Sequence, residues 1–218
     1  MDRVPSYSKA RIAAEEGFEK LQKRRSLKIA LLAAACFMSF CIDIALGPSS
    51  LSLKDVLLGL FNPDLVDKGT QVIIWKIRMP QAVMAVLVGM ALSLAGTEMQ
   101  TILNNPLASP FTLGVSAAAT LGAALAIVSG ISLPFISGNW LVSVNAFLFA
   151  FGSVLLLQAM ARWRGAGTGV LVLFGIALVF TFNALVALLH YIATPEALQQ
   201  VVFWSMGSLG RSNWEKVQ

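Results

Sequence analysis

Long apolar stretches separated by short polar connections make up most of the chain from residue 29 onward. The longest stretch without Asp, Glu, Lys or Arg covers residues 99–161. A soluble surface of that length needs ionic side chains to stay hydrated, so this pattern requires a lipid solvent. It predicts an all-α, polytopic transmembrane helix bundle, because backbone groups in hydrocarbon must bond within their own segment. We expect about five spanning helices, at about residues 27–46, 80–103, 111–128, 140–161 and 169–192.

The connections between these helices are polar, and each has an expected place. Residues 47–79 carry both signs of charge and include an apolar pattern at 51–61 that predicts a short interfacial helix. In the connection 104–110, Asn105, Pro106 and Pro110 predict a turn that ends one helix before the next begins. Residues 193–218 are again polar and have too few apolar residues to cross.

Composition and charge support the membrane class and suggest an orientation. Hydrophobic residues make up 57% of the chain and charged residues only 12%, with a mean hydropathy of +0.75. Eight of the 16 Lys and Arg residues lie in residues 1–28, so the net charge of +5 indicates topology rather than nucleic-acid binding. We expect residues 1–28 to form a cytoplasmic, basic, amphipathic segment and residues 29–218 to form the membrane domain. Arg162 and Arg164 also fit a cytoplasmic loop, which places the carboxyl terminus outside after five crossings.

Small residues recur at every fourth position in two of the expected helices. One stripe contains Ala85, Gly89, Ser93 and Thr97, and the other contains Gly114, Ala118, Gly122, Ala126 and Gly130. Helices in lipid associate through close backbone approach, so these stripes predict buried helix–helix contacts.

Reactive side chains are few. Cys36 and Cys41 lie in the first apolar stretch and are interpreted as small apolar residues. His190 is the only histidine, and no second ligand at helical spacing accompanies it, so we expect no metal site and no cofactor. Glu98 lies near one end of its expected helix. It is expected to be either an interfacial or subunit-contact carboxylate or a polar group on a translocation route.

The order of several motifs resembles the FecCD type of permease subunit, found in ABC importers for iron–siderophores, haem and vitamin B12. The resemblance covers about residues 73–214. The motifs are Arg78-Met79-Pro80, Val88-Gly89-Met90-Ala91-Leu92-Ser93-Leu94-Ala95-Gly96, Asn105-Pro106-Leu107-Ala108-Ser109-Pro110, Leu113-Gly114-Val115-Ser116, Leu173-Phe174-Gly175-Ile176-Ala177-Leu178 and Trp204-Ser205-Met206-Gly207-Ser208-Leu209.

The resemblance implies a multi-pass protein of the inner membrane with about ten helices, whose substrate passes between two permease subunits. It implies a second permease subunit, an extracytoplasmic substrate-binding protein and cytoplasmic ATPase subunits as partners. The chain is expected to be the amino-terminal portion, ending before the coupling helix that contacts the ATPase. No G-x-x-x-x-G-K-[ST] motif occurs in the sequence, so ATP hydrolysis is expected on another chain.

The resemblance also suggests roles for individual residues. Arg78 matches the first arginine of the family's Arg-Leu-Pro-Arg motif, which faces acidic residues of the binding protein; Gln81 replaces the second arginine, and Lys76 is a substitute for it. A headgroup anchor is the alternative role of Arg78. The expected inner gate is Gly167, Thr168 and Gly169, and the expected pathway-lining residues are Phe180, Asn183 and Ala187.

The function that these observations favour is import of iron–siderophore-type chelates by alternating access, without bond chemistry. Within the same family, haem and vitamin B12 are alternative cargoes. A polytopic membrane enzyme using Glu98 and His190 is an alternative from another class, although the two residues are expected near opposite faces of the bilayer. A membrane scaffold without transport is the third possibility.

Overall fold

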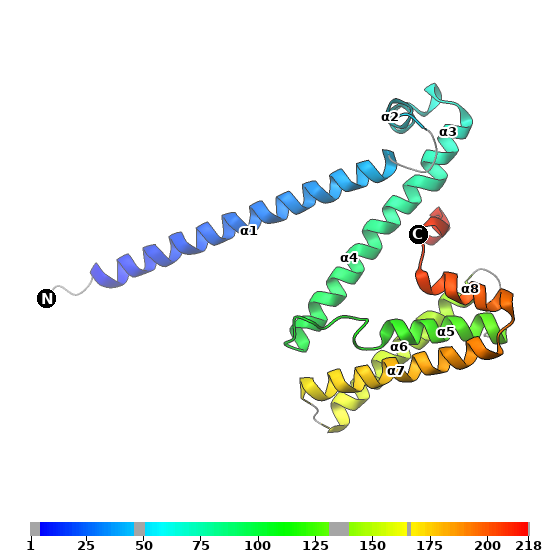
Figure 1. Cartoon of the computed structure of the whole chain (residues 1–218). Coiled ribbons are helices and arrows are strands. Elements are labelled where there is room, and N and C mark those ends of the chain that lie inside the picture. Colours follow the sequence, from blue (N-terminus) through cyan, green and yellow to red (C-terminus); the bar gives the residue numbers. More distant parts are fainter. Residues whose placement is uncertain (1–4, 46–50, 131–139, 165–166, 218) are drawn as a thin grey trace. The chain divides into compact units, whose positions relative to one another are not determined.

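The computed structural model describes residues 5–45, 51–130, 140–164 and 167–217, and every regular element in these ranges is helical (Figure 1). The all-α prediction is therefore confirmed. The α-helices are α1 (Pro5–Ala45), α2 (Leu53–Phe61), α3 (Lys68–Val72), α4 (Met79–Ile102), α5 (Val115–Ser129), α6 (Leu141–Arg164), α7 (Thr168–Ile192), α8 (Pro195–Met206) and α9 (Trp214–Val217). Short η elements are η1 (Pro63–Leu65), η2 (Ile73–Arg78) and η3 (Leu209–Arg211). The chain forms two compact units, the first made of residues 1–86 and 210–218 and the second of residues 87–209.

Four helical segments of the described chain are long and apolar enough to cross a membrane. They are Glu15–Ala45, Lys68–Ile102, Leu141–Trp163 and Thr168–Ile192. The remaining expected crossing, at about residues 111–128, corresponds to α5, which has 15 residues and a length of about 22 Å. Six residues of α5 are buried, so α5 is enclosed by protein rather than lipid over much of its surface. A helix enclosed in this way does not need to match the full thickness of the bilayer.

Whether α5 crosses decides on which side the carboxyl-terminal segment lies. With five crossings, a reporter fused after Gly167 lies on the same side as the amino terminus, and one fused after Val217 lies on the opposite side. We expect this pattern, with the first fusion in the cytoplasm. If α5 does not cross, both assignments are reversed. Paired alkaline phosphatase and fluorescent-protein fusions at the two sites distinguish these outcomes directly.

The second spanning helix begins earlier than the sequence suggested. The expected start at residue 80 is wrong, because α3, η2 and α4 form one continuous helical segment from Lys68 to Ile102. In a regular α-helix, Pro80 would lack a donor and its ring would meet the carbonyl group one turn earlier. The π-helical segment η2 precedes it, and the Met79 N–H bonds to the Ile74 carbonyl, five residues back. The wider turn accommodates the proline inside the helix.

The first unit is held together where α1 ends. Its apolar core contains Ile44, Val56 and Ala82, with Phe40 and Met79 packed against them. By contrast, the side chains of residues 15–39 on α1 are all exposed within this unit. The helix also has no break at residue 28, so the expected basic segment and the apolar span are one continuous rod.

Polar side chains close the ends of the short helices in this unit. Ser52 and Asp55 cap the start of α2 reciprocally, with the Asp55 N–H donating to Ser52 Oγ at 3.1 Å. At the start of α3, the Asp67 carboxylate accepts hydrogen bonds from the Thr70 hydroxyl at 2.6 Å and the Thr70 N–H at 3.0 Å. The hydroxyl bond, followed by the backbone bond, lowers the pKa of Asp67 because both favour its charged form.

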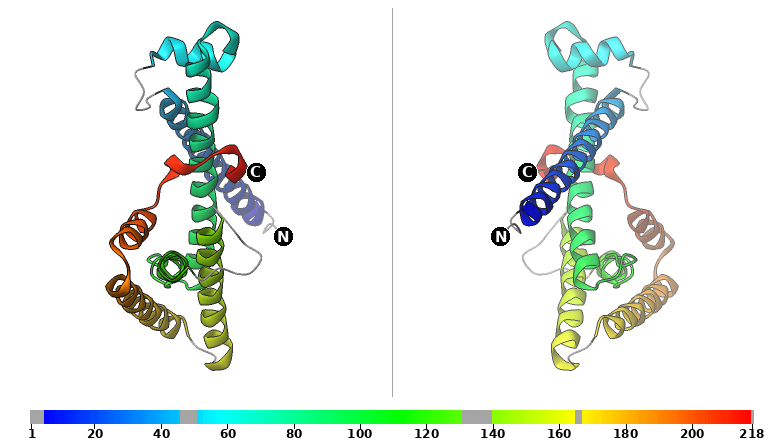
Figure 2. Two further views of the ribbon diagram at one scale, coloured as in Figure 1. Left: turned by 90° about the vertical axis from the view of Figure 1, so that its right-hand side faces the viewer. Right: turned by 90° about the vertical axis from the view of Figure 1, so that its left-hand side faces the viewer.

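The second unit is built around α5, which packs against α6, α7 and α8 (Figures 1 and 2). Its buried residues are Ala118, Leu121, Gly122, Ala123, Ala124 and Ala126. Most of these side chains are small, so neighbouring backbones approach closely instead of interdigitating long side chains. The helix begins at Val115, later than the expected residue 111, because residues 109–112 form a hydrogen-bonded turn before it.

Candidate functional site

Arg78 is buried in the first unit and bonds to the end of α1. Its side chain is only 5% exposed, and Nη1 donates to the Ile44 carbonyl at 2.6 Å and to the Ala45 carbonyl at 3.2 Å. The last carbonyl groups of a helix have no partner within the helix, and the negative end of the helix dipole favours a cation there. Arg78 therefore caps α1 and fixes it to η2. Sequence inspection missed this role because the partners lie more than 30 residues away.

The other two expected docking residues have different surroundings. Lys76 is exposed on η2, two residues before Arg78. Gln81 is half-buried, and its Nε2 donates to the Gly210 carbonyl at 3.3 Å. In the same unit, Trp214 Nε1 donates to the Trp75 carbonyl at 2.7 Å, and Trp75 Nε1 donates to the Gly59 carbonyl at 3.0 Å. Of the three expected docking residues, Lys76 alone presents an exposed charge.

Phe180, Asn183 and Ala187 share one face of α7, since they are spaced by three and four residues. All three are exposed within the second unit, with Phe180 at 72%. The Asn183 amide has no hydrogen-bond partner in the part of the chain that the structure describes. An amide on a membrane-spanning helix is costly to leave without a partner, so this face fits contact with water, a polar solute or another polypeptide.

The expected gate lies at the start of α7. Gly167 is its N-cap residue with extended backbone, and Thr168 is its first residue. A Cβ atom at Gly167 or Gly169 would meet no atom within 4 Å in the described structure. The preceding residues 165–166 lie outside the described ranges, so the glycine-rich connection is seen only in part.

The proline-bracketed connection between α4 and α5 is a structured turn. Asn105 Oδ1 accepts from the Leu107 N–H at 2.9 Å, and Gln100 Nε2 donates to the Pro106 carbonyl at 3.0 Å. Its apolar residues Leu103, Ala108 and Leu113 form a small core with Met99, Leu157 and Leu171. The backbone after it then approaches α7 closely.

Two glycines permit this approach. Gly114 has a φ of +83°, and a Cβ there would lie 3.2 Å from Leu178 Cβ. A Cβ on Gly175 would lie 2.9 Å from Leu113 Cα. The turn and α7 therefore meet at backbone distance. Gly175 lies in a motif that carries the family resemblance, but its partner could not be read from the sequence.

The two small-residue stripes have different surroundings. A Cβ at Gly122 would lie 2.5 Å from the Asn145 carbonyl oxygen of α6 and 2.9 Å from Phe149 Cβ. A Cβ at Gly89 would meet no atom within 4 Å, and Ser93 on the same stripe of α4 is exposed. Within the described chain, Gly122 lies in a close helix contact and the Gly89 stripe has no packing partner.

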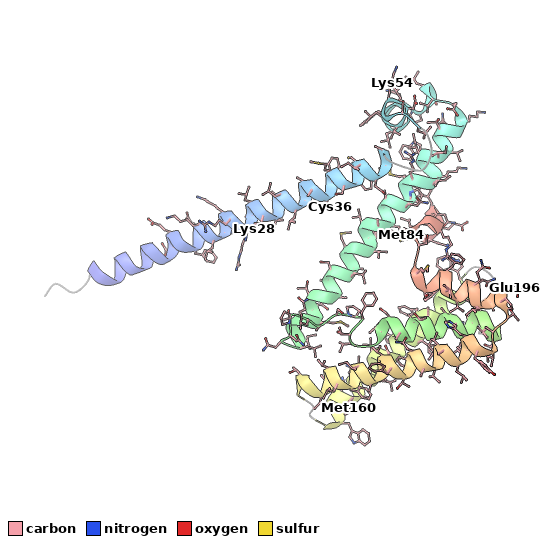
Figure 3. All side chains as sticks on the ribbon, viewed as in Figure 1. Lys28, Cys36, Lys54, Met84, Met160 and Glu196 are labelled. Atoms are coloured by element: carbon pink, nitrogen blue, oxygen red, sulfur yellow. The ribbon has the colours of Figure 1, made fainter. Side chains whose placement is uncertain are left out.

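The remaining candidate side chains lie on three different helices, α1, α4 and α7. Glu98 is exposed on α4, and His190 is partly buried near the end of α7. Cys36 and Cys41 are exposed on α1 as free thiols (Cys36 is labelled in Figure 3). Among the described residues, no three His, Cys, Asp or Glu side chains are arranged to hold a metal ion.

These features define a polytopic helical membrane protein with an exposed amide, Asn183, on a spanning helix. The model of the FecCD transport family matches residues 33–218, so the chain belongs to that family. This confirms the resemblance derived from the motifs between Arg78 and Leu209.

Individual relatives match over much of the chain. A protein named as an iron chelatin transport system permease of Helicobacter pylori is 36% identical, and the match covers 87% of this chain and 57% of that protein. The vitamin B12 import system permease protein BtuC of Shigella boydii is 32% identical over 89% of this chain and 56% of its own length. Further relatives are named for hemin or molybdate transport. The chain thus spans about half the length of the curated relatives it matches.

A solved structure agrees with this assignment. It is a metal-chelate type ABC transporter in an inward-facing conformation, with a TM-score of 0.68 and 34% sequence identity. The match covers 85% of this chain and 55% of that chain. The fold of this solved structure and the family model therefore support the same assignment.

Proposed function

We propose that this chain is part of a permease subunit of a binding-protein-dependent ABC importer that moves iron–siderophore-type chelates by alternating access. Membership of the FecCD family supports the transporter class, and the relative named for iron chelatin transport supports the cargo. The observation that carries the proposal is the exposed face of α7 with Phe180, Asn183 and Ala187. An aromatic ring and an amide on one face suit a large, partly polar chelate, and the residues that the structure describes form no catalytic constellation.

The proposed partners are a second permease subunit, cytoplasmic ATPase subunits and an extracytoplasmic binding protein, with the assembly in the inner membrane and the amino terminus in the cytoplasm. The second subunit would cover the face of α7 that the described chain leaves open. Gly167, Thr168 and Gly169 would form the inner gate, since a short glycine-rich connection before α7 can absorb backbone rotation. Packing by Gly114 and Gly122 within the chain, and by Gly89 and Ser93 against a helix outside the described residues, would hold the helices during the motion.

Cargo and pathway are tested together by uptake in cells. The full-length protein, with its ATPase and binding protein, is produced in a strain without its own importers. Uptake of radiolabelled iron–siderophore is then compared with that of haem, cobalamin and molybdate. We expect uptake of the iron chelate, and uptake of a different compound alone would replace the proposed cargo.

Asn183→Leu tests the α7 face in the same assay. We expect at least a fivefold decrease in uptake rate, about 1 kcal/mol, because the variant loses the polar group that compensates for a desolvated solute. Leu188→Ala is the matched control, since Leu188 is exposed on a different face of the same helix. Equal uptake by Asn183→Leu and the parent, at equal membrane levels, would exclude a pathway role for this amide.

Docking of the binding protein is proposed to use the exposed charge of Lys76, while Arg78 and Gln81 support the same end of the helix. Lys76→Glu should lower the association rate of the loaded binding protein about tenfold at low salt, because complementary charges mainly steer encounter. The difference should shrink as salt is added. Surface plasmon resonance on the reconstituted transporter measures both. Lys54→Glu, also exposed in this unit, is the control of equal charge change; equal rates for the two variants would refute a specific role of Lys76.

A further inference from the structure

A dense group of cations lies on α1 directly before its apolar part. We call Lys20, Lys23, Arg24, Arg25 and Lys28 the basic collar. No Asp or Glu interrupts residues 20–28, so this short segment carries five positive charges. The function proposed above makes no use of it.

The length of the apolar part of α1 fixes the depth of the collar. The apolar stretch 29–42 spans about 21 Å as a helix, whereas the hydrocarbon core of a bilayer is about 30 Å thick. If Asp43 lies at one interface, Lys28 is about 22 Å and Lys20 about 34 Å from it along the helix axis. The collar therefore straddles the opposite boundary between hydrocarbon and headgroups. Its long side chains can extend to the phosphate layer while their methylene groups stay in apolar surroundings.

Among the described residues of its own unit, the collar has almost no partner. All five side chains are exposed, and Figure 3 shows Lys28 on a part of α1 that no other element of its unit covers. The one ion pair of the collar among the described residues joins Lys23 Nζ to a Glu19 carboxylate oxygen at 4.0 Å, with both side chains largely exposed. Such a pair neutralises little charge. Phe18 and Leu21 are also exposed, at 67% and 58%, and suit the interfacial layer.

We propose that the basic collar binds the phosphate groups of anionic phospholipids and enriches these lipids around α1. Two guanidinium groups offer forked donors that match phosphate geometry, and three ammonium groups add point charges. Clustered cations next to a spanning helix are attracted to an anionic leaflet, each one contributing separately. The helix backbone holds these cations at the depth of the headgroups. An acidic soluble protein could contact them only by entering the headgroup layer, so lipid phosphate is the favoured partner.

The proposal predicts a measurable lipid preference. The full chain, with Gln22→Cys in a Cys36→Ser, Cys41→Ser background, carries a fluorophore at residue 22 and is reconstituted in phosphatidylcholine vesicles. Quenching is compared for phosphatidylglycerol and phosphatidylcholine that carry the same nitroxide near the top of one acyl chain. We expect phosphatidylglycerol to be preferred about threefold or more, and the preference to fall toward one at high salt. Inorganic phosphate at constant ionic strength should not compete.

Charge-matched variants identify the cations responsible. Replacement of Arg24, Arg25 and Lys28 by Gln should remove more than half of the preference, whereas replacement of Lys54, Lys68 and Lys76 by Gln should leave it unchanged. Arg24→Lys with Arg25→Lys should keep most of it. An equal loss in both Gln triples would show a net-charge effect and overturn the proposal. Displacement by inorganic phosphate would indicate a free-anion site instead. If the parent protein shows no preference for phosphatidylglycerol, the proposal is overturned and an acidic protein surface is favoured as the partner. This measurement on the parent protein decides even if the Gln variant fails to insert.

Discussion

Arg78→Met should lower the stability of the protein in detergent by about 1.5–3 kcal/mol, because it removes charge-assisted hydrogen bonds from buried carbonyl groups. The two acceptors, Ile44 O and Ala45 O, lie at the end of α1, where the helix offers them no partner. Ile44 is 2% exposed, so water replaces the lost donor poorly. Methionine keeps much of the volume and removes the charge, which separates loss of the cap from loss of packing.

The measurement is the midpoint of unfolding, followed by the fluorescence of the tryptophans. Lys76→Met is the matched control, since it removes one positive charge from the same π-helical segment at an exposed position. Arg78→Lys should recover only part of the stability, because an ammonium group lacks the planar fork and has a shorter reach. Equal midpoints for Arg78→Met and Lys76→Met would show that the cap contributes nothing.

The buried position of Arg78 makes it a poor site at which to test the proposed docking of a binding protein. A charge reversal at Arg78 would place a carboxylate against the carbonyl oxygens of Ile44 and Ala45, so it would damage the fold and docking together. Lys76 has no such constraint. A loss of association in Lys76→Glu with an unchanged unfolding midpoint would therefore be attributable to the docking surface itself.

Sequence alone predicted the helical membrane class and most helix positions, because a long stretch without charge has only one suitable solvent. The prediction failed at positions where contacts between distant residues override local sequence preferences. Proline at residue 80 is typical of a helix start, yet η2 carries the helix through it. Arg78 next to it was interpreted as a surface charge, but its acceptors come from the distant end of α1. A single sequence contains no signal that a π-helical segment precedes Pro80, and none that Arg78 bonds to the end of α1.

The small-residue stripes also show that a sequence pattern does not identify its contact partner. Spacing by four identifies a face that permits close approach, but it does not say which helix approaches. The two stripes look alike in sequence, and yet Gly122 touches α6 while Gly89 faces no atom of the described chain. The buried helix–helix contact predicted for the Gly89 stripe stays a prediction.

Gly122→Leu should therefore destabilise this chain by about 3 kcal/mol or more, whereas Gly89→Leu should change its stability little. A Cβ at Gly122 would lie 2.5 Å from the Asn145 carbonyl oxygen and 2.9 Å from Phe149 Cβ. The first of these atoms is backbone, so relief requires α5 and α6 to move apart. Overpacking a well-packed core, with the side-chain and backbone shifts it forces, typically costs about 1–3 kcal/mol and occasionally more. The cost here lies at the upper end, because separation of the two helices would open the contact around which the second unit is built.

A graded series makes this test specific. Gly122→Ala should lose part of the stability lost by Gly122→Leu, because the Cβ alone already overlaps Asn145. Gly152→Ala on α6 should lose none, since its Cβ would meet no atom within 4 Å. Unfolding midpoints in one detergent measure all four variants. If Gly122→Leu matches the parent, α5 and α6 do not pack through Gly122. If Gly89→Leu instead impairs only the assembled transporter, the contact partner of its stripe lies on another part of the assembly.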